Sequence, residues 1–423
     1  MIKYKKKRVV VTGMGCITPI GKNIKEYWNS LINGVNGCEP ITYFNTKKYK
    51  TKFACELKNY DASIFFNSKD RIKLDPCIQY GLIAADEAIK DSTINWNNKK
   101  INKERIGVVW ASGIGGLLNL ENSISNYIKG DGYPRFSPYF IPKMLIDTTS
   151  GYISMRYGIH GPNYATVSAC ASSSNAIVDA YHLICLGKAD IIISGGSEAA
   201  ITPSGVGGFN ALHALSTRNE DYKTASRPFD KDRDGFVLGE GAGCLVLEEY
   251  IHAKSRNANI YAEIGGIGMS GDAYHITTPH PEGKGIILAM KLALEDAGIT
   301  YKEVNHINSH GTSTILGDLA EIKAIQKVFG SHIYKIYINA TKSMTGHLLG
   351  AAGAIEAIAT ILPLTKNNIP PTINLFKLDK KIDSKINFIP NNKIKKHVNI
   401  NICNTFGFGG HNVCILFNKI VKY

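Results

Sequence analysis

Two hydrophobic patterns alternate along the chain. Apolar runs of about four to eight residues, typical of buried strands, are separated by stretches in which apolar residues recur every three or four positions, as in helices. The predicted strands are 8–12, 105–111, 189–196, 243–248, 261–268, 306–309 and 337–339. The predicted helices are 26–32, 78–89, 176–183, one ending near 254, 286–297, 319–329 and 349–362. This alternation indicates an α/β fold built in layers.

The order of elements in the second part of the chain resembles the order in the first, as though one unit had been duplicated. We expect residues 1–258 and 259–423 to be the two halves of one fused body, because no Pro- or Ser-rich linker separates them. In this scheme His347, just before a helix, occupies the position that Cys170 has in the first half. We expect the two turns to face each other across a pseudo-two-fold axis.

Glycines follow two of the strands without forming a nucleotide-binding motif. Gly13-Met-Gly15 is predicted to turn the chain, but Thr18 stands where a dinucleotide motif needs its third glycine. Gly21-Lys22 lacks the remaining residues of a P-loop. The loop 112–116 also lacks the required spacing, so it predicts close backbone packing around a pocket.

Length and composition narrow the class of protein. The chain has 423 residues, 44% of them hydrophobic, which is enough for a large core. No uninterrupted run of about 18 apolar residues predicts a transmembrane helix, and the basic start at 1–8 precedes too short an apolar stretch for a signal peptide. We therefore expect a cytoplasmic protein, or the mature form of one imported into a plastid or apicoplast stroma.

Charge and cysteine usage exclude several functions. The net charge is +14, which favours an acidic partner, but no basic stripe interleaved with aromatic residues predicts nucleic-acid binding. The nine cysteines include no C-x-x-C pair, so a zinc ribbon is not expected and a reducing compartment is. His306 and His310 have no evident third ligand, so no metal site is predicted.

The stretch 166–180 is the first candidate for chemistry. Small residues around Cys170 leave room for a substrate, and Ala176, Ile177 and Ala180 then follow at helical spacing. A thiol at a helix N-terminus feels the positive end of the helix dipole, which favours the reactive thiolate. Taken alone, this stretch also fits a buried structural cysteine.

Three further stretches are polar where a core would be apolar. They are 308–314, which contains His310, 341–347, which contains Lys342 and His347, and the glycine-rich 404–410. A thiolate can hold an acyl group as a thioester, and two neutral imidazoles can stabilise the enolate that forms when carbon dioxide leaves a malonyl group. A cysteine protease would leave one histidine and Lys342 unexplained.

Together these stretches resemble the β-ketoacyl-[acyl-carrier-protein] synthases, the condensing enzymes of fatty-acid synthesis. The resemblance runs from about residue 9 to 417 and has five motifs in order. They are Ala169-Cys-Ala-Ser172, Ser226-Arg-Pro-Phe-Asp-Lys-Asp-Arg-Asp-Gly-Phe-Val-Leu-Gly-Glu-Gly-Ala242, His310-Gly-Thr-Ser-Thr314, Thr341-Lys-Ser-Met-Thr-Gly-His347 and Asn404-Thr-Phe-Gly-Phe-Gly-Gly410. The resemblance implies a thiolase-like fold, with two similar halves in five α-β-α-β-α layers, and a homodimer.

The resemblance also implies roles for individual residues. Cys170 matches the nucleophile, and His310 and His347 match the paired histidines. Lys342 matches a supporting lysine, with Glu356 as its carboxylate partner. The remaining implied site residues are Phe406, whose N–H joins that of Cys170 in the oxyanion hole and whose ring is a gate, the phosphopantetheine contacts Thr312 and Thr314, the acyl contacts Ile114 and Phe408, and the supporting Asp318.

The implied reaction is ping-pong. An acyl-carrier protein delivers an acyl chain to Cys170, and the enolate from malonyl-carrier protein then attacks that thioester, with no metal or redox cofactor. Ile114 resembles the pattern of the type II class, which favours medium to long chains, and type I specificity or a polyketide ketosynthase are the alternatives. The carrier protein is acidic in this family, so the candidate docking residues are Lys69, Arg71, Lys73 and Arg135.

Two other readings of the chain and one departure from the family pattern follow from the motifs. A degradative thiolase should have a second catalytic cysteine in the C-terminal glycine-rich motif, whereas Cys403 lies before that motif. A non-catalytic chain-length partner would typically lack the nucleophile. His411 follows the motif where many relatives have threonine, although some have histidine.

Overall fold

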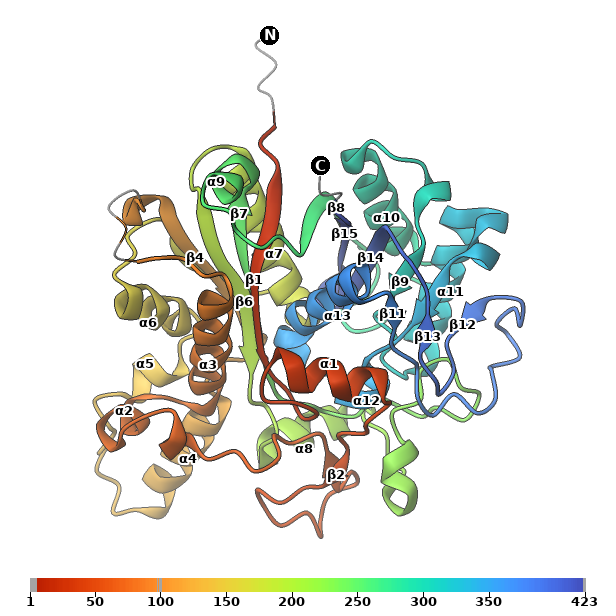
Figure 1. The fold of residues 1–423 in the computed structure, drawn as a ribbon. Helices are drawn as coiled ribbons and strands as arrows, with labels where there is room; N and C mark the ends of the chain where they lie inside the picture. The colour runs from red at the N-terminus through yellow and green to blue at the C-terminus, as the bar shows by residue number, and fades with distance from the viewer. Residues whose placement is uncertain (1–5, 97, 99–100, 421–423) are drawn as a thin grey trace.

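The computed structural model describes residues 6–96, 98 and 101–420. The expectation that no signal peptide is present rests on residues 1–8, and most of these lie outside the described residues. Among the described residues, the strands form one mixed sheet of eleven strands and two sheets of two strands each. Figure 1 shows the first part of the chain on the left and the second on the right, with helices on both sides.

The large sheet consists of two halves with the same strand order. The first half contains β1 (Val9–Ile17), β4 (Ile106–Ala111), β5 (Asn163–Thr166), β6 (Ile191–Glu198) and β7 (Gly241–Glu249). The second contains β8 (Ala262–Gly271), β9 (His306–Asn308), β10 (Tyr337–Asn339), β14 (Ile400–Gly407) and β15 (His411–Asn418), with β12 (Asn387–Phe388) at its edge. The order β12-β10-β9-β14-β15-β8-β1-β7-β6-β4-β5 places β1 and β8 at the centre, and each half then runs outward through its fifth, fourth, second and third strand. The predicted repetition of elements is confirmed.

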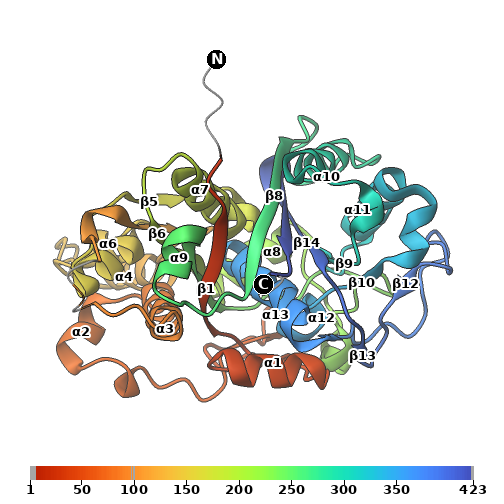
Figure 2. The same cartoon turned by 45° about the horizontal axis from the view of Figure 1, so that its top comes forward.

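Helices cover both faces of each half-sheet. The outer helices of the first half are α3 (Pro76–Asp91) and α6 (Thr148–Tyr157), and those of the second are α10 (Lys284–Ala297) and α11 (Ile315–Phe329). Between the half-sheets lie α7 (Ser172–Cys185) and α13 (Ala352–Lys366), which contact each other and pack on β6 and β14 respectively. Figure 2 shows this central pair between the two sets of strands. The result is the predicted five-layer α-β-α-β-α fold.

The alternation of side chains along β4 shows why its sequence is apolar throughout. Val108 and Trp110 point into the outer core with α3, whereas Val109 and Ala111 point into the central core with α7. Because both faces are covered, neither set can be polar. The same pattern holds for the inner strands of the second half, where Ile402 lies in the outer core and Cys403 in the central one.

The prediction that Gly13-Met-Gly15 turns the chain is wrong. β1 continues to Ile17 along β7, with a register shift between Val11 and Gly13. The glycines serve close packing against α3, since a Cβ at Gly15 would lie 2.1 Å from the carbonyl oxygen of Ala84. They are therefore strand residues that let a helix approach the sheet.

Among the residues that the structure describes, one helix resembles a membrane span by length and composition alone. It is the window Leu349–Lys366, and 89% of it is buried inside the protein, which is the position of a core helix. Carboxylate Glu356 lies in its middle and is itself buried.

The remaining helices and strands lie around this frame. They are α1 (Ile24–Ile32), α2 (Ser68–Lys73), α4 (Leu117–Lys129), α5 (Phe140–Met144), α8 (Pro203–Ala211), α9 (Tyr250–Ser255), α12 (Lys342–Thr345), β2 (Glu39–Pro40), β3 (Phe53–Ala54), β11 (Asn368–Ile369) and β13 (Ile394–Lys395). The pattern predicted α1 and α9 among these and missed the others. Most of the missed elements are short, but α4 has apolar residues at helical spacing and was overlooked.

Candidate active site

Cys170 lies in a short 3-10 turn, Ala169–Ala171, directly before α7. The Ser172 hydroxyl closes this turn, since it donates to the carbonyl of Ala169 at 2.6 Å and accepts the N–H of Ser168 at 2.9 Å. Ala169 has a positive φ of 50°, which is a strained conformation for a residue with a side chain. The predicted placement of the cysteine at a helix start is confirmed.

The end of β14 passes against this turn. A Cβ at Gly407 would lie 2.8 Å from the carbonyl oxygen of Ser168 and 3.1 Å from the nitrogen of Cys170. A side chain at this position would therefore push the nucleophile's turn away from the glycine-rich segment that follows.

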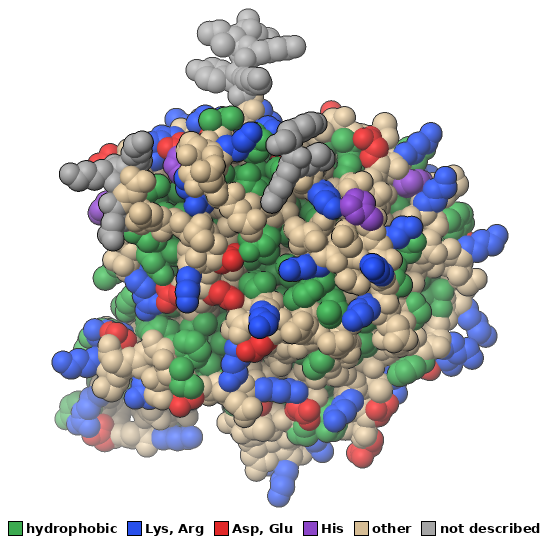
Figure 3. All heavy atoms as spheres, viewed as in Figure 1, with side chains coloured by type: hydrophobic (Ala, Val, Ile, Leu, Met, Phe, Trp, Pro, Cys, Tyr) green, Lys and Arg blue, Asp and Glu red, His purple; other side chains and the backbone are tan. Residues whose placement is uncertain are grey.

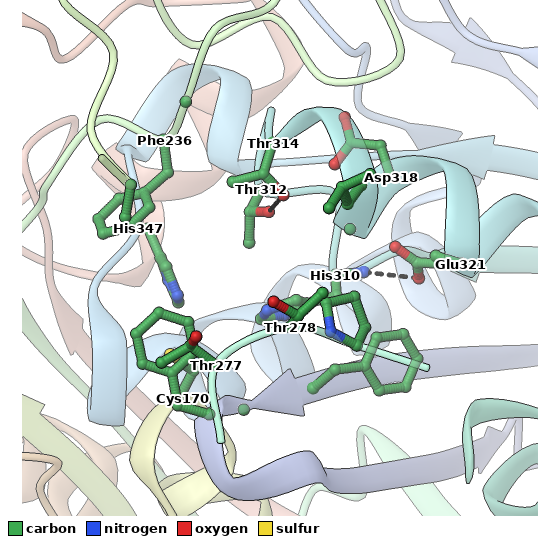
Figure 4. Close-up of a pocket in the computed structure, with 18 of the residues that line it drawn as sticks. Cys170, Phe236, Thr277, Thr278, His310, Thr312, Thr314, Asp318, Glu321 and His347 are labelled. Carbon is green, nitrogen blue, oxygen red and sulfur yellow. Dashed lines mark hydrogen bonds between the residues drawn. The ribbon is translucent and has the colours of Figure 1, made fainter. Parts of the chain in front are cut away.

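A cavity of about 330 Å³ brings together the predicted thiol and both predicted histidines. Figure 4 shows Cys170 and His347 on one side of it and His310 on the other. The rings of His310 and His347 are nearly perpendicular, with centroids 5.3 Å apart. The nucleophile comes from the first half of the chain and the histidines from the second.

Lys342 is buried behind His310. Its ammonium group donates to the carbonyl of His310 at 2.6 Å, contacts Nδ1 of the same ring at 3.2 Å and forms a buried ion pair with Glu356. The structure thus places the lysine and carboxylate beside the histidine that the resemblance implied. Because an ammonium can only donate, Nδ1 of His310 is the acceptor and its proton is on Nε2.

Both histidines are neutral at physiological pH. Burial and the charge of Lys342 hold the pKa of His310 and of His347 well below the ordinary histidine value. Burial also raises the pKa of Glu356 to about 7, against the opposing effect of Lys342. A neutral imidazole can donate its N–H to a substrate without taking up a proton from that substrate.

Cys170 is less acidic than the sequence predicted. The pKa of its thiol is raised to about 12, mainly by burial and to a smaller extent by Glu198. The charge of Lys342, the N–H of Phe408 and the thiol's own backbone N–H lower it without overcoming burial. The prediction of a thiolate favoured by the helix dipole therefore fails for the substrate-free protein, because removal of water outweighs the dipole.

The two phenylalanines of the glycine-rich turn have different positions. The ring of Phe406 packs on His310, with centroids 5.6 Å apart. The backbone N–H that faces the sulfur of Cys170 belongs to Phe408, whereas the sequence pointed to Phe406. Gly409, with φ of 83°, makes this turn, and its N–H donates to the carbonyl of Ile276 at 2.6 Å.

Thr312 and Thr314 line the cavity, with their hydroxyl oxygens 3.0 Å apart. Asp318, one turn into α11, accepts the N–H groups of Ser313 at 3.1 Å and Phe229 at 2.9 Å and faces Arg233 at 3.3 Å. Burial raises the pKa of Asp318 to about 6. The carboxylate thus fixes the backbone that carries the two threonines.

Ile114 lies outside the main cavity. It lines a separate, open hollow on the first half of the chain, together with Leu145, Ile146 and Tyr164. It is 38% exposed. The structure therefore does not bring Ile114 together with the threonines and histidines.

The expected equivalence of His347 and Cys170 is wrong by three residues. The second-half turn that matches Ala169–Ala171 is Leu349–Ala351, where Leu349 has a φ of 45°. Gly350 therefore corresponds to Cys170, and the two turns contact each other as expected.

Two buried carboxylates near the site were not predicted from the sequence. Glu321 accepts the N–H groups of His310 and Gly311, both at 2.8 Å. Glu198 accepts N–H groups from loops on either side of the Cys170 turn. The available signal was a carboxylate within a run of buried positions, which is unusual unless it is hydrogen-bonded.

Other predicted or excluded groups lie away from the cavity. His306 faces Asn339 at 2.8 Å, and burial lowers its pKa to about 4. Cys403 is buried in the central core. Among the described residues, no cluster of three or more His, Cys, Asp or Glu side chains is placed to hold a metal ion.

A partly buried cysteine at a helix start, facing two neutral histidines across a duplicated five-layer fold, defines a ketosynthase, an enzyme that forms carbon–carbon bonds between acyl units. The chain belongs to the β-ketoacyl synthase family. Residues 6–253 match the model of the family's N-terminal domain and residues 261–376 that of its C-terminal domain. The chain is accordingly an acyltransferase of the condensing type.

Similar proteins cover the chain almost completely. A 3-oxoacyl-[acyl-carrier-protein] synthase 2 of Synechocystis is 45% identical over 99% of this chain and 100% of that protein. The protein of the same name from Coxiella burnetii is 44% identical over 98% of this chain and 99% of its own length.

Solved structures of other ketosynthases share the fold. A β-ketoacyl synthase from Burkholderia phymatum has a TM-score of 0.90 and 34% identity, covering 98% of this chain and all of that one. A ketosynthase in complex with a type II PKS acyl-carrier protein and bound to a hexaketide has a TM-score of 0.90 and 32% identity, covering 99% and 100%.

Proposed function

We propose that the protein elongates fatty acids as a 3-oxoacyl-[acyl-carrier-protein] synthase of the type II class. The observation that carries the proposal is the convergence of Cys170, His310 and His347 on one cavity, with Lys342 behind the histidines. Relatives about 45% identical over nearly their whole length have that name, which supports the carrier-bound substrate.

In the first step the sulfur of Cys170 attacks the carbonyl of an acyl thioester. The developing oxyanion accepts the N–H groups of Cys170 and Phe408, so Phe408 takes the role that the sequence assigned to Phe406. The bond to the carrier's sulfur breaks, and the carrier leaves as a thiol with the proton lost by Cys170. Phe406 instead holds the ring of His310 in place.

In the second step a malonyl thioester enters the same cavity. His310 and His347 donate to its thioester oxygen, and Lys342 fixes the tautomer of His310 that makes this possible. Carbon dioxide leaves, and the bonding electrons form an enolate, whose carbon attacks the Cys170 thioester. The bond between the acyl carbon and the Cys170 sulfur breaks, the sulfur leaves as a thiolate that takes up a proton from solvent, and the β-ketoacyl product leaves on the carrier.

The remaining predicted residues have supporting roles in this proposal. Thr312 and Thr314 hydrogen-bond the phosphopantetheine arm at the cavity wall, and Asp318 holds their backbone. Glu356 is the counter-charge of Lys342. Ile114, which lines the separate hollow on the first half of the chain, contacts the far end of long acyl chains.

Carrier docking and dimer formation are further parts of the proposal. Arg71 and Lys69 on α2 are exposed, while Lys73 and Arg135 face acidic neighbours at 3.7 and 2.9 Å. On the face that Figure 3 shows, basic side chains are spread widely with acidic ones between them, so docking on this face relies on a few local contacts rather than on one broad patch.

A homodimer is supported by the edge strand β5. Its residue Tyr164 is 37% exposed, and Val167, just beyond it, is 58% exposed. Strand pairing there would cover both. We further propose that residues 1–258 and 259–423 are the two halves of the subunit, that it does not insert into membranes or bind nucleic acid, and that it works in the cytoplasm, or in a plastid or apicoplast stroma.

The test is acylation by a long-chain acyl-carrier protein, read by peptide mass spectrometry. The acyl mass should appear on the peptide containing Cys170, and Cys185→Ser, which changes the other cysteine of intermediate burial, should leave it unchanged. Absence of the adduct, or its appearance elsewhere, refutes the proposal. A series of primer lengths with malonyl-carrier protein then separates long-chain elongation from type I or polyketide specificity.

A further inference from the structure

Glu198 is a fully buried carboxylate at the end of β6 that the proposed reaction does not use. Its Oε2 accepts the N–H of Gly113 at 2.8 Å and the N–H of Gly350 at 2.9 Å. Its Oε1 accepts the hydroxyl of Ser112 at 2.9 Å and the N–H of Ile114 at 3.2 Å. Burial raises the pKa of Glu198, and the four donors oppose this shift because they stabilise the ionised carboxylate.

These bonds join loops from both halves of the chain beside the Cys170 turn. A Cβ at Gly350 would lie 2.1 Å from the nitrogen of Gly113, and a Cβ at Gly113 would lie 3.6 Å from the carbonyl oxygen of Ala169. The backbones of the three turns are therefore in direct contact, and Glu198 provides the hydrogen bonds that the close approach demands.

Two strained residues lie in the connected turns. Ala169, next to Cys170, has φ of 50°, and Leu349, next to Gly350, has φ of 45°. A left-handed residue with a side chain costs about 1–2 kcal/mol and persists only where its surroundings hold it. The bonds of Glu198 to Gly113 and Gly350 are such a constraint.

We propose that Glu198 is a positioning residue for Cys170, tying the loop 112–115 to the turn 349–351 and holding the nucleophile's turn against them. Its negative charge also opposes that of Lys342 at the thiol. The positioning part rests on the proposed acyl transfer, whereas the electrostatic part concerns the free thiol alone.

The charges around the thiol come from both halves of the chain. Cys170 shares the cavity with His310 and His347 and interacts electrostatically with Lys342 and Glu198; Glu198 in turn interacts electrostatically with Cys77, Asp75 and Cys170. The histidines are neutral, so Lys342 and Glu198 are the charges that act on the thiol. Lys342 lowers the pKa of Cys170 and Glu198 raises it.

Glu198→Gln keeps the shape and removes the charge. The rate of Cys170 alkylation by iodoacetamide, followed by mass spectrometry across pH, should shift to lower pH and rise at least about threefold at pH 8, because more thiolate is present. Acylation by acyl-carrier protein should fall about 10- to 100-fold, because the turn is less well held. An unshifted alkylation profile overturns the electrostatic part, and normal acylation overturns the positioning part.

The matched control is Glu87→Gln. Glu87 is a carboxylate on α3 that also accepts two backbone N–H groups, from Cys16 and Ile24, both at 2.8 Å, but it does not face the cavity. Both the alkylation profile and acylation should be unchanged in it. An equal change of alkylation and acylation in Glu87→Gln would mean that the removal of any such carboxylate has this effect, which overturns the specific role of Glu198.

Ser112→Ala keeps the charge of Glu198 and removes one donor. It should slow acylation about threefold or more without moving the alkylation profile to lower pH. If Glu198→Gln does not fold, an unchanged acylation rate in Ser112→Ala overturns the proposal. If the unmodified protein alkylates at Cys170 but accepts no acyl group, the proposed function fails while the electrostatic role is still tested.

Discussion

Replacing Lys342 by methionine should destabilise the protein strongly. The lysine and its partner Glu356 have side chains only 2% and 1% exposed, and the variant leaves the Glu356 carboxylate buried without a counter-charge. Two unit charges about 3 Å apart at an effective dielectric of about 20 attract by about 5 kcal/mol. Breaking a buried pair on one side costs about 3–5 kcal/mol, and because Glu356 can take up a proton, we expect a loss near 3 kcal/mol.

The assay is a double-mutant cycle read by urea unfolding. Lys342→Met and Glu356→Leu should each lower the free energy of unfolding, whereas the double variant should lie within about 1 kcal/mol of the original protein, since an apolar pair of similar size needs no counter-charge. The control is the pair Lys323 and Glu282, whose side chains are 54% and 68% exposed and whose coupling should be about 0–1 kcal/mol.

Strictly additive losses in Lys342→Met and Glu356→Leu would refute this reasoning, because they would show that the charges do not depend on each other. The stable double variant should still lack malonyl decarboxylation, since Nδ1 of His310 no longer faces an ammonium group. The double variant would thereby show that the loss of decarboxylation does not come from a loss of stability.

Three further predictions concern the site and its pH dependence. His310→Ala and His347→Ala should each slow malonyl decarboxylation about 10²- to 10³-fold while Cys170 remains open to acylation, and equal losses in both steps would contradict their assigned role. Burial raises the pKa of Glu240 to about 7, so the folded state keeps a proton that the unfolded state loses above about pH 4.5, and stability falls as pH rises through this window. Glu240→Gln should remove that slope and be up to about 3 kcal/mol more stable at pH 8 in urea titrations, whereas an unchanged slope contradicts the shift. Ile114→Phe should shorten the longest primer accepted, and an unchanged primer series would place Ile114 outside the acyl path.

The layers were predictable because the inner strands are apolar on both faces. Residues 106–111 show this pattern, and helices of matching period surround them. β14 was not predicted because the buried asparagines Asn401 and Asn404 interrupt its apolar run. The extension of β1 beyond residue 12 was not predicted because glycines usually end a strand. Here Gly13 and Gly15 instead allow α3 to pack closely on the strand.

The chemistry of the site was predictable where it depends on residue type and not where it depends on packing. Cys170 and the two histidines were identified from polar stretches beside small residues. The choice between the N–H groups of Phe406 and Phe408 depends on the backbone at Gly409, which no side-chain pattern reveals. The high pKa of Cys170 comes from the packing of the folded chain around a thiol that is only partly open to the cavity.

The matching turns at Ala169 and Leu349 bear on how the chain can evolve. Both halves have the same strained backbone at this turn, but one presents the sulfur of Cys170 and the other has only a hydrogen atom at Gly350. Room for a side chain at Gly350 would have to come from the backbone of Gly113, 2.1 Å from its Cβ position. A side chain at Gly350 is thus incompatible with the contact between Gly113 and this turn, so no single substitution can move the nucleophile from the first half of the chain to the second.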